Sequence, residues 1–416
     1  MVIDKEARVD RQQPGHGQVW VGIDVGKGAH HAAAVDGDGQ LVWSRRVAND
    51  QAAIQGLIGQ ATASATRVCW AVDSTGSSAA VLLALLAAAD QPVLYVPGRV
   101  VNRMAGAFAG EAKTDAKDAV VIAQTARMRQ DLLAARPRPE LVAELAVLVG
   151  HRRDLMADWV RTVSRLRGLL QASFPGLERC FDFTSRSALV LVGRYQTPEA
   201  LRAVGRRRLA AWLRRQVPTQ LSDARVEQMA EAALQAAAAQ TIRLPAQEVT
   251  ARLIAQLAND LLALDRRIKD LDKTITQRLA SHPQARIICS LPGMGPLLAA
   301  ELLVAVWDLS SFPDAGHLAA YAGLAPVPRD SGRRTGNLHP PQRYHRGLRR
   351  VFYLSALSSL SSPGPNQGYY RRKRAQGRTH QQALMALARR RVDVLWALLR
   401  DNRCFELTAP VKTTTA

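Results

Sequence analysis

The chain has 416 residues, of which 47% are hydrophobic and 22% are charged, and this composition is that of a globular protein of two or three domains. Lysine and arginine outnumber aspartate and glutamate by 56 to 35, and the net charge of +21 favours a polyanionic partner. Nucleic acid is the usual partner of this kind, and an anionic membrane surface is the competing interpretation. Because no apolar run is long enough to span a membrane and the N-terminus lacks a signal-peptide core, we expect a cytoplasmic protein.

The positive charge is unevenly distributed along the chain. Residues 1–130 contain 13 Lys and Arg and 12 Asp and Glu, whereas the remainder contains 43 and 23. A nearly neutral domain can hold a cluster of carboxylates when a bound metal balances their charge. The four cysteines are scattered singly, so they indicate neither a zinc site nor a disulfide framework, and we expect buried reduced thiols: they are Cys69, Cys180, Cys289 and Cys404.

The first third of the chain predicts an α/β domain. Apolar runs predict strands at 19–26, 31–35, 41–47, 67–73 and 92–96, and helical patterns lie between them at 50–63 and 77–89. A further helix is expected to begin near Thr114. The resulting order, β-β-β-α-β-α-β-α, is that of a ribonuclease-H-like (RuvC-like) mixed sheet with helices, and we assign this domain to residues 17–133.

Four aspartates stand at positions where this topology brings residues together. Asp24 ends the first strand and Asp73 ends the fourth, and these strands are neighbours in the ribonuclease-H order. Asp115 and Asp118 are three residues apart on a helix and therefore share a face. Any one of them could be a turn residue or a helix cap. Together they predict a site for Mg²⁺ or Mn²⁺, which prefer hard oxygen ligands and can clamp a phosphodiester.

The middle of the chain is helical. Pro137 and Pro139 mark a boundary, and residues 140–170 and 248–279 carry apolar side chains at helical spacing. Two long amphipathic helices far apart in sequence predict an antiparallel coiled-coil arm, and a simple helical core is equally compatible with the pattern. We assign the arm and its connecting helices to residues 138–285. Residues 181–247 contain no interpretable motif.

Two segments of the mainly helical domain at 286–400 suggest contacts with phosphates. Gly293 and Gly295 in the sequence PGMG could let backbone N–H groups approach a phosphate, as in a helix-hairpin-helix, although such turns also occur in ordinary helical proteins. Ser331 lies in a basic loop with Arg329, Arg333 and Arg334. A serine in this setting could attack a phosphodiester and form a phosphoserine link, but nothing local distinguishes it from an ordinary loop serine.

A basic run interleaved with tyrosines follows this loop. Tyrosines 344, 353, 369 and 370 lie among the cations, so the run suits a surface that follows phosphates with some base stacking. The alternative is a solvated basic face. The cations are Arg343, Arg346, Arg349, Arg350, Arg371, Arg372, Lys373 and Arg374. The ends of the chain, residues 1–16 and 405–416, are expected to be flexible.

Six motifs, in this order, resemble those of the DEDD-type insertion-sequence transposases, which are bridge-RNA-guided serine recombinases related to the Piv DNA invertases. In the N-terminal part they are GIDVGK at 22–27, DSTG at 73–76 and KTDAKDA at 113–119. In the C-terminal part they are LPGMGP at 291–296, YAGLAP at 321–326 and DSG at 330–332. The middle of the chain matches the family only in its helical character.

The resemblance implies a RuvC-like domain with Asp24, Asp73, Asp115 and Asp118 as its acids, and a C-terminal transposase domain with Ser331 as nucleophile. It further implies cutting and rejoining of double-stranded donor and target DNA, guidance by a non-coding bridge RNA, and a tetramer of paired dimers with active sites shared between subunits. The family's second acid is usually glutamate, whereas this chain has Asp73, which is one methylene shorter.

Two other functions are compatible with parts of the sequence. A metal-dependent nuclease, such as a junction resolvase, would use the four acids to activate water but would leave the Gly-Met-Gly and Ser-Gly segments unexplained. An architectural nucleic-acid-binding protein would need only the basic C-terminal half, and four converging acids would then repel the phosphates. The sequence does not separate transposition from site-specific inversion by the same chemistry.

Overall fold

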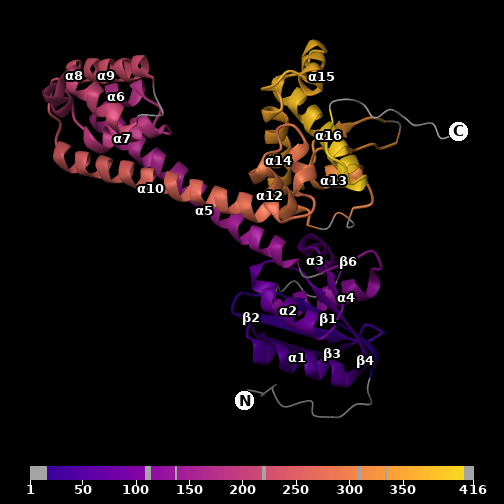
Figure 1. The fold of residues 1–416 in the computed structure, drawn as a ribbon. Coiled ribbons are helices and arrows are strands. Elements are labelled where there is room, and N and C mark those ends of the chain that lie inside the picture. Colours follow the sequence, from indigo (N-terminus) through magenta and orange to yellow (C-terminus); the bar gives the residue numbers. More distant parts are fainter. Residues whose placement is uncertain are drawn as a thin grey trace, which may run out of the picture. The chain divides into compact units, whose positions relative to one another are not determined.

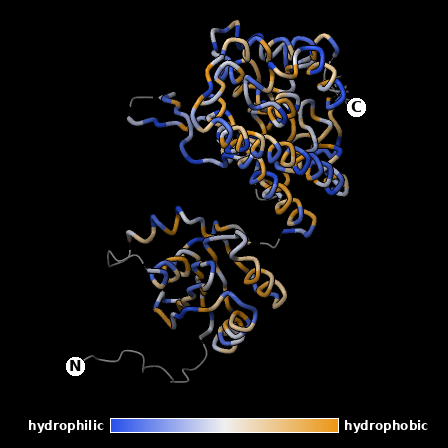
Figure 2. Tube along the Cα trace, turned by 90° about the vertical axis from the view of Figure 1, so that its left-hand side faces the viewer, coloured by the Kyte–Doolittle hydropathy of each residue, from blue (hydrophilic) through white to orange (hydrophobic). Residues whose placement is uncertain are grey.

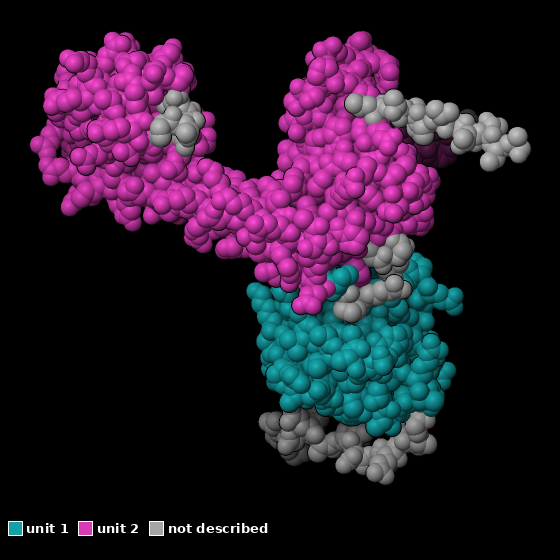
Figure 3. Space-filling view, in the orientation of Figure 1, with its two compact units in different colours: residues 1–139 teal, residues 140–416 magenta. Residues whose placement is uncertain are grey.

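The computed structural model describes residues 16–107, 114–135, 138–217, 222–307, 309, 312–332 and 335–406. The chain divides into two compact units, residues 1–139 and 140–416 (Figure 3). Of the segments predicted to be flexible, 1–16 and 405–416, residues 1–15 and 407–416 lie outside the described residues, as do Arg333 and Arg334. At the end of the described chain, the Phe405 N–H donates to Ser290 Oγ at 2.8 Å.

Unit 1 is built on a six-stranded mixed sheet in the order β3-β2-β1-β4-β5-β6. β1 pairs antiparallel with β2 and parallel with β4, β4 pairs parallel with β5, and the edge strands β3 and β6 pair antiparallel with β2 and β5. The strand bounds are β1 His16–Asp24, β2 Ala29–Val35, β3 Leu41–Ala48, β4 Ala65–Val72, β5 Val93–Tyr95 and β6 Leu133–Ala134.

Helices cover both faces of this sheet, because side chains of successive strand residues point to opposite faces. Val19, Val21 and Ile23 pack with α1 (Gln51–Ser64) and α2 (Ala80–Ala88), which follows the short helix η1 (Ser77–Ala79). On the other face, Ala71 and Trp20 pack with α3 (Gly98–Ala105) and α4 (Asp115–Met128). The predicted mixed α/β domain is confirmed and is compatible with a ribonuclease-H-like fold; α3 and β6 were not predicted.

Gly22 brings α4 close to the central strand β1. A Cβ atom at this position would lie 2.2 Å from the Ala119 oxygen and 2.3 Å from the Ala123 nitrogen, both in the backbone of α4. The missing side chain therefore sets the distance between the strand that ends at Asp24 and the helix that begins at Asp115.

We expect Gly22→Ala to destabilise the protein by about 1–3 kcal/mol, the usual cost of overpacking a core, since the new methyl group would push against backbone atoms. Gly56→Ala on α1 is the matched control, because no atom lies within 4 Å of a Cβ at that position. Alanine in place of glycine inside an exposed helix raises the free energy of unfolding by up to about 1 kcal/mol. Calorimetry of the two full-length variants measures the difference. Equal unfolding temperatures would contradict the packing explanation.

Unit 2 contains two long helices, α5 (Glu140–Ser173) and α10 (Gln247–Ala280), which lie side by side (Figure 1). Arg152 Nε donates to Asp272 Oδ1 and Arg278 donates to Glu144, and these pairings show that the helices run antiparallel. Hydrophilic and hydrophobic positions alternate along helices of both units (Figure 2). The two helices of the predicted arm are present, and their supercoiling into a coiled coil stays a prediction.

Each end of this helix pair joins a separate hydrophobic core. Leu145 and Leu279 belong to the core of the C-terminal helices, whereas Leu166 and Ile254 belong to the core of the helices inserted between α5 and α10. The inserted helices are α6 Pro175–Cys180, α7 Arg186–Arg194, α8 Pro198–Gln216 and α9 Asp223–Ala238.

The C-terminal helices confirm the expected helical character of this part. They are α11 Ala285–Ser290, α12 Pro296–Ala305, α13 Ala315–Tyr321, α14 Arg346–Ser358, α15 Pro365–Ala375 and α16 His380–Arg400. Between α13 and α14, the short strands β7 (Val327–Pro328) and β8 (Leu338–His339) pair antiparallel. Within the described residues no helix is long and apolar enough to cross a membrane. All four cysteines are unpaired, but none is buried as expected, since Cys180 is exposed and Cys69, Cys289 and Cys404 are half-buried.

Candidate functional site

Asp24 and Asp73 lie at the same edge of the sheet in unit 1. Asp24 is the last residue of β1, and Asp73 directly follows β4, whose Val72 stands opposite Ile23 in the parallel pair. The Val25 N–H donates to Asp73 Oδ1 at 3.2 Å, so the segment after β1 contacts the Asp73 carboxylate directly. The predicted convergence of these two strand ends is therefore present in the backbone.

The first turn of α4 brings the other two aspartates to this edge. Thr114 caps the helix, accepting from the Lys117 N–H at 3.2 Å, and Asp115 and Asp118 follow in the first turn. Carboxylates are stabilised at this end by the helix dipole. The backbone of Ala119 lies beside Gly22 of β1, and the charge of Asp118 acts on Asp73, so the first turn of α4 lies near the strand ends. We call Asp24, Asp73, Asp115 and Asp118 the acidic edge.

At the acidic edge, Asp73 experiences the negative charge of Asp118. Burial raises the pKa of Asp73, the Val25 N–H opposes this rise, and the nearby Asp118 carboxylate raises the pKa further. A like charge and partial desolvation both disfavour the ionised form of Asp73. A cation between Asp73 and Asp118 would offset this repulsion.

The donor types at the acidic edge fit a divalent cation, while the side chains do not enclose one. Within the described residues, no three His, Cys, Asp or Glu side chains are grouped so that they could hold a metal ion. Carboxylate oxygens are the ligands that Mg²⁺ and Mn²⁺ prefer, and the backbone brings all four acids to one edge. A metal would therefore require side-chain rotation at the acidic edge.

Two further side chains beside the acidic edge, His31 and Tyr95, were missed by sequence reasoning. His31 stands opposite Asp24 in the β1–β2 pair, and burial lowers its pKa while Asp115 opposes the decrease. Tyr95 pairs with Val72, and its pKa is raised by burial and by Asp73, with Arg99 opposing. Their positions follow from the strand register, which the sequence pattern alone does not fix.

Ser331 is exposed in the segment that joins β7 to β8. We call residues 327–339 the serine hairpin; its residues 333 and 334 lie outside the described part of the chain. The hairpin is held by Asn337, whose N–H donates to Asp330 Oδ1 at 2.9 Å and whose amide donates to the Arg329 oxygen at 3.2 Å. Gly332 has a φ of 57°, in the left-handed region that favours glycine. A polar cross-link therefore shapes the turn that presents Ser331 to solvent.

The segments that flank the serine hairpin meet where Gly323, which follows α13, packs against Tyr344, which precedes α14. A Cβ at Gly323 would lie 2.4 Å from the ring of Tyr344, so only glycine allows this ring to pack there. The same ring also contacts the Arg349 guanidinium, which lies 4.6 Å from the ring centre. His345 then caps α14, since its Nδ1 accepts from the Leu348 N–H at 2.9 Å.

The cap formed by His345 predicts a loss of stability in acid. Burial and the cation of Arg153 on α5 lower the pKa of His345, and the ring of Tyr321 on α13 lies 5.3 Å away. Because the folded pKa is below the unfolded value of about 6.5, the unfolded state binds more protons between the two values. This contribution to stability is complete above about pH 6.5 and is lost as the pH falls through the folded pKa.

His345→Asn tests this prediction, because asparagine also caps helices but does not titrate. We expect the unfolding temperature of the wild-type chain to fall more steeply below pH 6.5 than that of the variant, as measured by calorimetry in a pH series. Parallel curves for the two proteins would contradict a titrating cap.

The loop that contains Gly293 and Gly295 is held by contacts with α14 and α16. A Cβ at Gly293 would lie 2.5 Å from the Ser355 oxygen of α14, and its φ is 80°, so packing alone explains this glycine. Arg391 on α16 is only 2% exposed, and its Nη2 donates to the Pro292 oxygen and to Ser355 Oγ. Burial lowers the pKa of Arg391 to about 10. A phosphate contact by this loop stays a prediction.

The tyrosines of the basic run hold cations. The ring of Tyr369 lies within 5.2–5.7 Å of Arg372, Lys373 and Arg390, and the Tyr370 hydroxyl is 2.7 Å from His380 Nδ1. Tyr344 is covered by Arg349 as described, and Tyr353 packs against the core. The rings therefore order cations on α15 and α16 and are not open platforms for bases.

The predicted basic residues differ in their partners. Arg350 pairs with Glu301, which occupies its charge, and Arg374 donates to the Arg378 oxygen. Arg343, Arg346 and Arg371 are exposed and have no acidic partner in the described part of the chain. The last three are the residues with the most freedom to contact phosphates.

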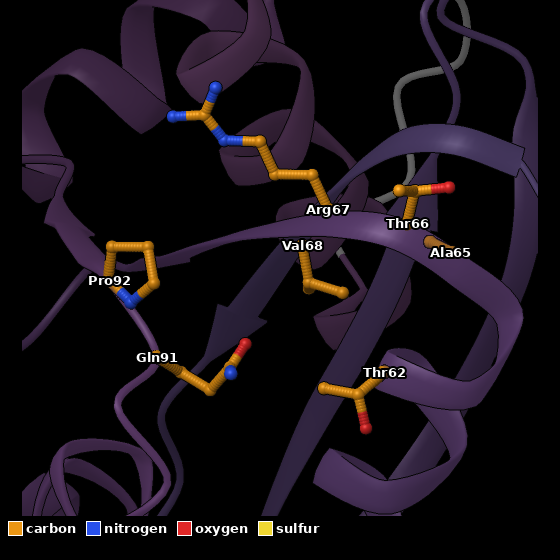
Figure 4. A pocket seen from close by; sticks show the side chains of 7 residues that line it. All are labelled: Thr62, Ala65, Thr66, Arg67, Val68, Gln91 and Pro92. Atoms are coloured by element: carbon orange, nitrogen blue, oxygen red, sulfur yellow. The ribbon is translucent and has the colours of Figure 1, made fainter.

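A pocket of about 360 Å³ lies at the opposite end of β4 from Asp73. It is lined by Thr62, Ala65, Thr66, Arg67, Val68, Gln91 and Pro92, and Arg67 extends on one side of the strand while Thr62 and Gln91 lie on the other (Figure 4). The lining holds one cation and no carboxylate. Ligand sites in open sheets lie at the carboxyl ends of parallel strands, so the acidic edge is the stronger candidate.

Comparison with known proteins gives family matches in the N-terminal and in the C-terminal part of the chain. A transposase family model matches residues 21–175, and a model described as the transposase IS116/IS110/IS902 family matches residues 285–371. The chain is 52% identical over 400 residues to the insertion element IS116 uncharacterized 44.8 kDa protein of Streptomyces clavuligerus, covering 96% of this chain and 99% of that protein. The matched ranges contain the acidic edge and the serine hairpin.

Two further relatives extend the comparison. The insertion element IS900 uncharacterized 42 kDa protein of Mycobacterium paratuberculosis is 46% identical over 402 residues, covering 96% of this chain and 99% of that protein. The pilin gene-inverting protein of Moraxella bovis is 32% identical over 148 residues, which are 33% of this chain and 45% of that protein.

Proposed function

Because the chain belongs to the IS116/IS110/IS902 transposase family, we propose that it cuts and rejoins DNA strands through a covalent link between Ser331 and a DNA phosphate. Transposase activity on DNA follows from the family, and the serine chemistry is the further step. The observation that carries it is the serine hairpin, in which Asn337 and Asp330 hold a turn that exposes Ser331 in a basic loop.

The proposed chemistry conserves the number of phosphoester bonds. The Ser331 Oγ–phosphorus bond forms as the scissile phosphorus–oxygen bond breaks, and the hydroxyl proton of the serine ends on the departing DNA oxygen. A hydroxyl end of DNA then attacks the phosphoserine, which restores the serine and joins the strands. Arg329 and the exposed Arg343 and Arg346 supply positive charge that can stabilise the phosphate during attack.

The acidic edge is proposed to hold Mg²⁺ or Mn²⁺ through Asp24, Asp73, Asp115 and Asp118. Such a metal supplies Lewis-acid activation of a phosphate. The chain's own contribution is the placement of the four carboxylates by the ends of β1 and β4 and by the first turn of α4. Asp73 is held by the Val25 N–H, which fixes the carboxylate despite its shorter side chain.

The partners are proposed from the same resemblance. Double-stranded donor and target DNA would be recognised with the help of a non-coding bridge RNA, and the protein would act as a dimer of dimers. The predicted division into domains at 17–133, 138–285 and 286–400 is proposed to serve this assembly, with α5 and α10 as a coiled-coil arm. Gly293, Gly295 and the exposed arginines are proposed to contact nucleic acid.

Trapping the protein on DNA tests the serine chemistry. The full-length chain is incubated with the DNA ends of its element and the bridge RNA, denatured, and digested, and the peptide linked to DNA is identified by mass spectrometry. A link at Ser331 supports the proposal. Free DNA ends without any linked peptide would instead indicate a metal-dependent nuclease in which the acidic edge activates water.

Site-specific inversion by the same chemistry is a second candidate function. The similarity to the pilin gene-inverting protein of Moraxella bovis favours it, since the printed name of that protein describes inversion. A plasmid carrying two inverted copies of the element ends separates the two functions, because inversion keeps the plasmid intact whereas transposition moves the segment to a new site.

A further inference from the structure

The lobe formed by α6 to α9 is rich in arginine. Residues 174–246 contain 11 arginines, no lysine and 6 acidic residues. The lobe lies at the end of α5 and α10 opposite the C-terminal helices (Figure 1), and a helix of 34 residues is about 50 Å long. A surface here is therefore well separated from the serine hairpin within unit 2.

The acidic residues of the lobe neutralise one face of α8. Arg206 pairs with Glu227 at 3.2 Å and with Glu231 at 3.3 Å. Arg214 pairs with Asp223 and Glu227, both at 2.7 Å. All three acids belong to α9, so these pairs join α9 to α8 and use up the negative charge beside it.

The outer face of α8 keeps its positive charge. Arg207, Arg208, Ala211 and Arg215 are all exposed, and we call them the basic strip. Arg207, Ala211 and Arg215 follow the spacing of one helical face. Arg208 donates to the oxygens of Ala203 and Val204, whereas Arg207 and Arg215 have no acidic partner within the described residues.

The three consecutive arginines of α8 lie where the helix dipole is unfavourable for cations. Gly205 has a φ of 67° and a ψ of 163°, so α8 is interrupted there, and a new helical segment begins with Arg206, Arg207 and Arg208. Cations in the first turn of a helix are repelled by its dipole. A phosphate bound near the strip would be attracted both by the arginines and by the positive end of the helix dipole.

We propose that the basic strip binds the phosphate backbone of duplex DNA, at a contact separate from the serine hairpin. Arginine suits phosphate because its guanidinium donates two parallel hydrogen bonds. The small Ala211 lets the backbone approach between the arginines. The strip contains no aromatic side chain, and the neighbouring Trp212 packs edge-on against Tyr195, with ring centres 5.2 Å apart. Without a ring to stack on unpaired bases, the strip favours duplex over single strands. The inference rests on the proposed function only in taking DNA as the substrate.

The salt dependence of binding tests this contact. For the full-length chain and a random-sequence duplex, we expect Arg207→Gln with Arg215→Gln to reduce the slope of log K against log salt by about 1.8, or about 0.9 for each lost phosphate contact. The control is Arg161→Gln with Arg243→Gln, which removes the same charge from exposed arginines paired with Asp158 and Glu248. Equal slopes for the two double variants would overturn the proposal.

A photo-crosslinking amino acid at Ala211 gives a second measurement, which reports the position of bound DNA and not the binding constant. We expect it to crosslink to duplex DNA, whereas the same group at the exposed Ala224, beside the acids of α9, does not. Crosslinking to duplex RNA alone, or equal crosslinking from both positions, would overturn the proposal. Because these readouts need no strand cleavage, they can succeed when the serine chemistry fails, and the trapped Ser331 link can form when they fail.

Discussion

Replacement of Ser331 by alanine is expected to abolish both strand joining and the covalent protein–DNA adduct. Alanine removes the only atom of this side chain that can attack phosphorus, so the rate should fall by at least about 10³-fold, as for other enzymes that lose a nucleophile. Because Ser331 is exposed and the hairpin is held by Asn337 and Asp330, the fold and DNA binding should be retained. Gel separation of products and adduct measures both activities.

Ser362→Ala is the matched control, since Ser362 is another exposed serine of unit 2 outside the serine hairpin. It should join strands at the wild-type rate. A Ser331→Ala protein that still forms the adduct would show that another residue is the nucleophile.

Replacement of Asp118 by asparagine is expected to reduce activity while changing metal-free stability little. Asp118 raises the pKa of Asp73, so removing its charge relieves repulsion, and this gain offsets the lost interaction of the Asp118 carboxylate with the dipole of α4. The same change removes a proposed ligand, so Mg²⁺-dependent activity should fall at least about 10²-fold. Chelation by EDTA should stop the wild-type reaction, and excess Mg²⁺ should restore it.

Calorimetry with and without Mg²⁺ supplies a readout other than activity. A ligand that binds the folded state raises the unfolding temperature, so wild-type protein should gain stability with Mg²⁺ and Asp118→Asn should gain less. Asp38→Asn, at an exposed turn of the same unit, is the control and should respond to Mg²⁺ as the wild type does. The metal proposal is wrong if neither activity nor stability of the wild type depends on a divalent ion.

The acidic edge could be predicted because its determinants are local. Apolar runs that end at Asp24 and Asp73 specify where two strands stop, and Thr114 before Asp115 is a helix-start signal. Only the order of the strands was needed to bring these ends together. The helical character of the long segments around Leu145 and Leu279 was equally accessible from spacing.

The remaining features depend on which elements pack together. Periodicity cannot show that the Tyr369 ring is surrounded by three cations, or that Arg391 lies buried beneath a loop a hundred residues earlier in the chain. Acidic residues of α9 pair with Arg206 and Arg214 of α8. Which arginines of α8 lack an acidic partner therefore depends on how the two helices pack, and the sequence pattern does not show this. The two-residue strands β7 and β8 are too short for an alternating pattern to reveal them.

The cores at the two ends of α5 and α10 also affect the order in which the chain folds during its synthesis. Leu145 and Val149 leave the ribosome early, and their partners Ile275 and Leu279 follow more than a hundred residues later. At bacterial or slower elongation rates this delay is on the order of 10 s. We therefore expect the start of α5 to lack these partners until α10 is complete. A chain truncated before Ile275 should leave Leu145 and Val149 without this part of their core.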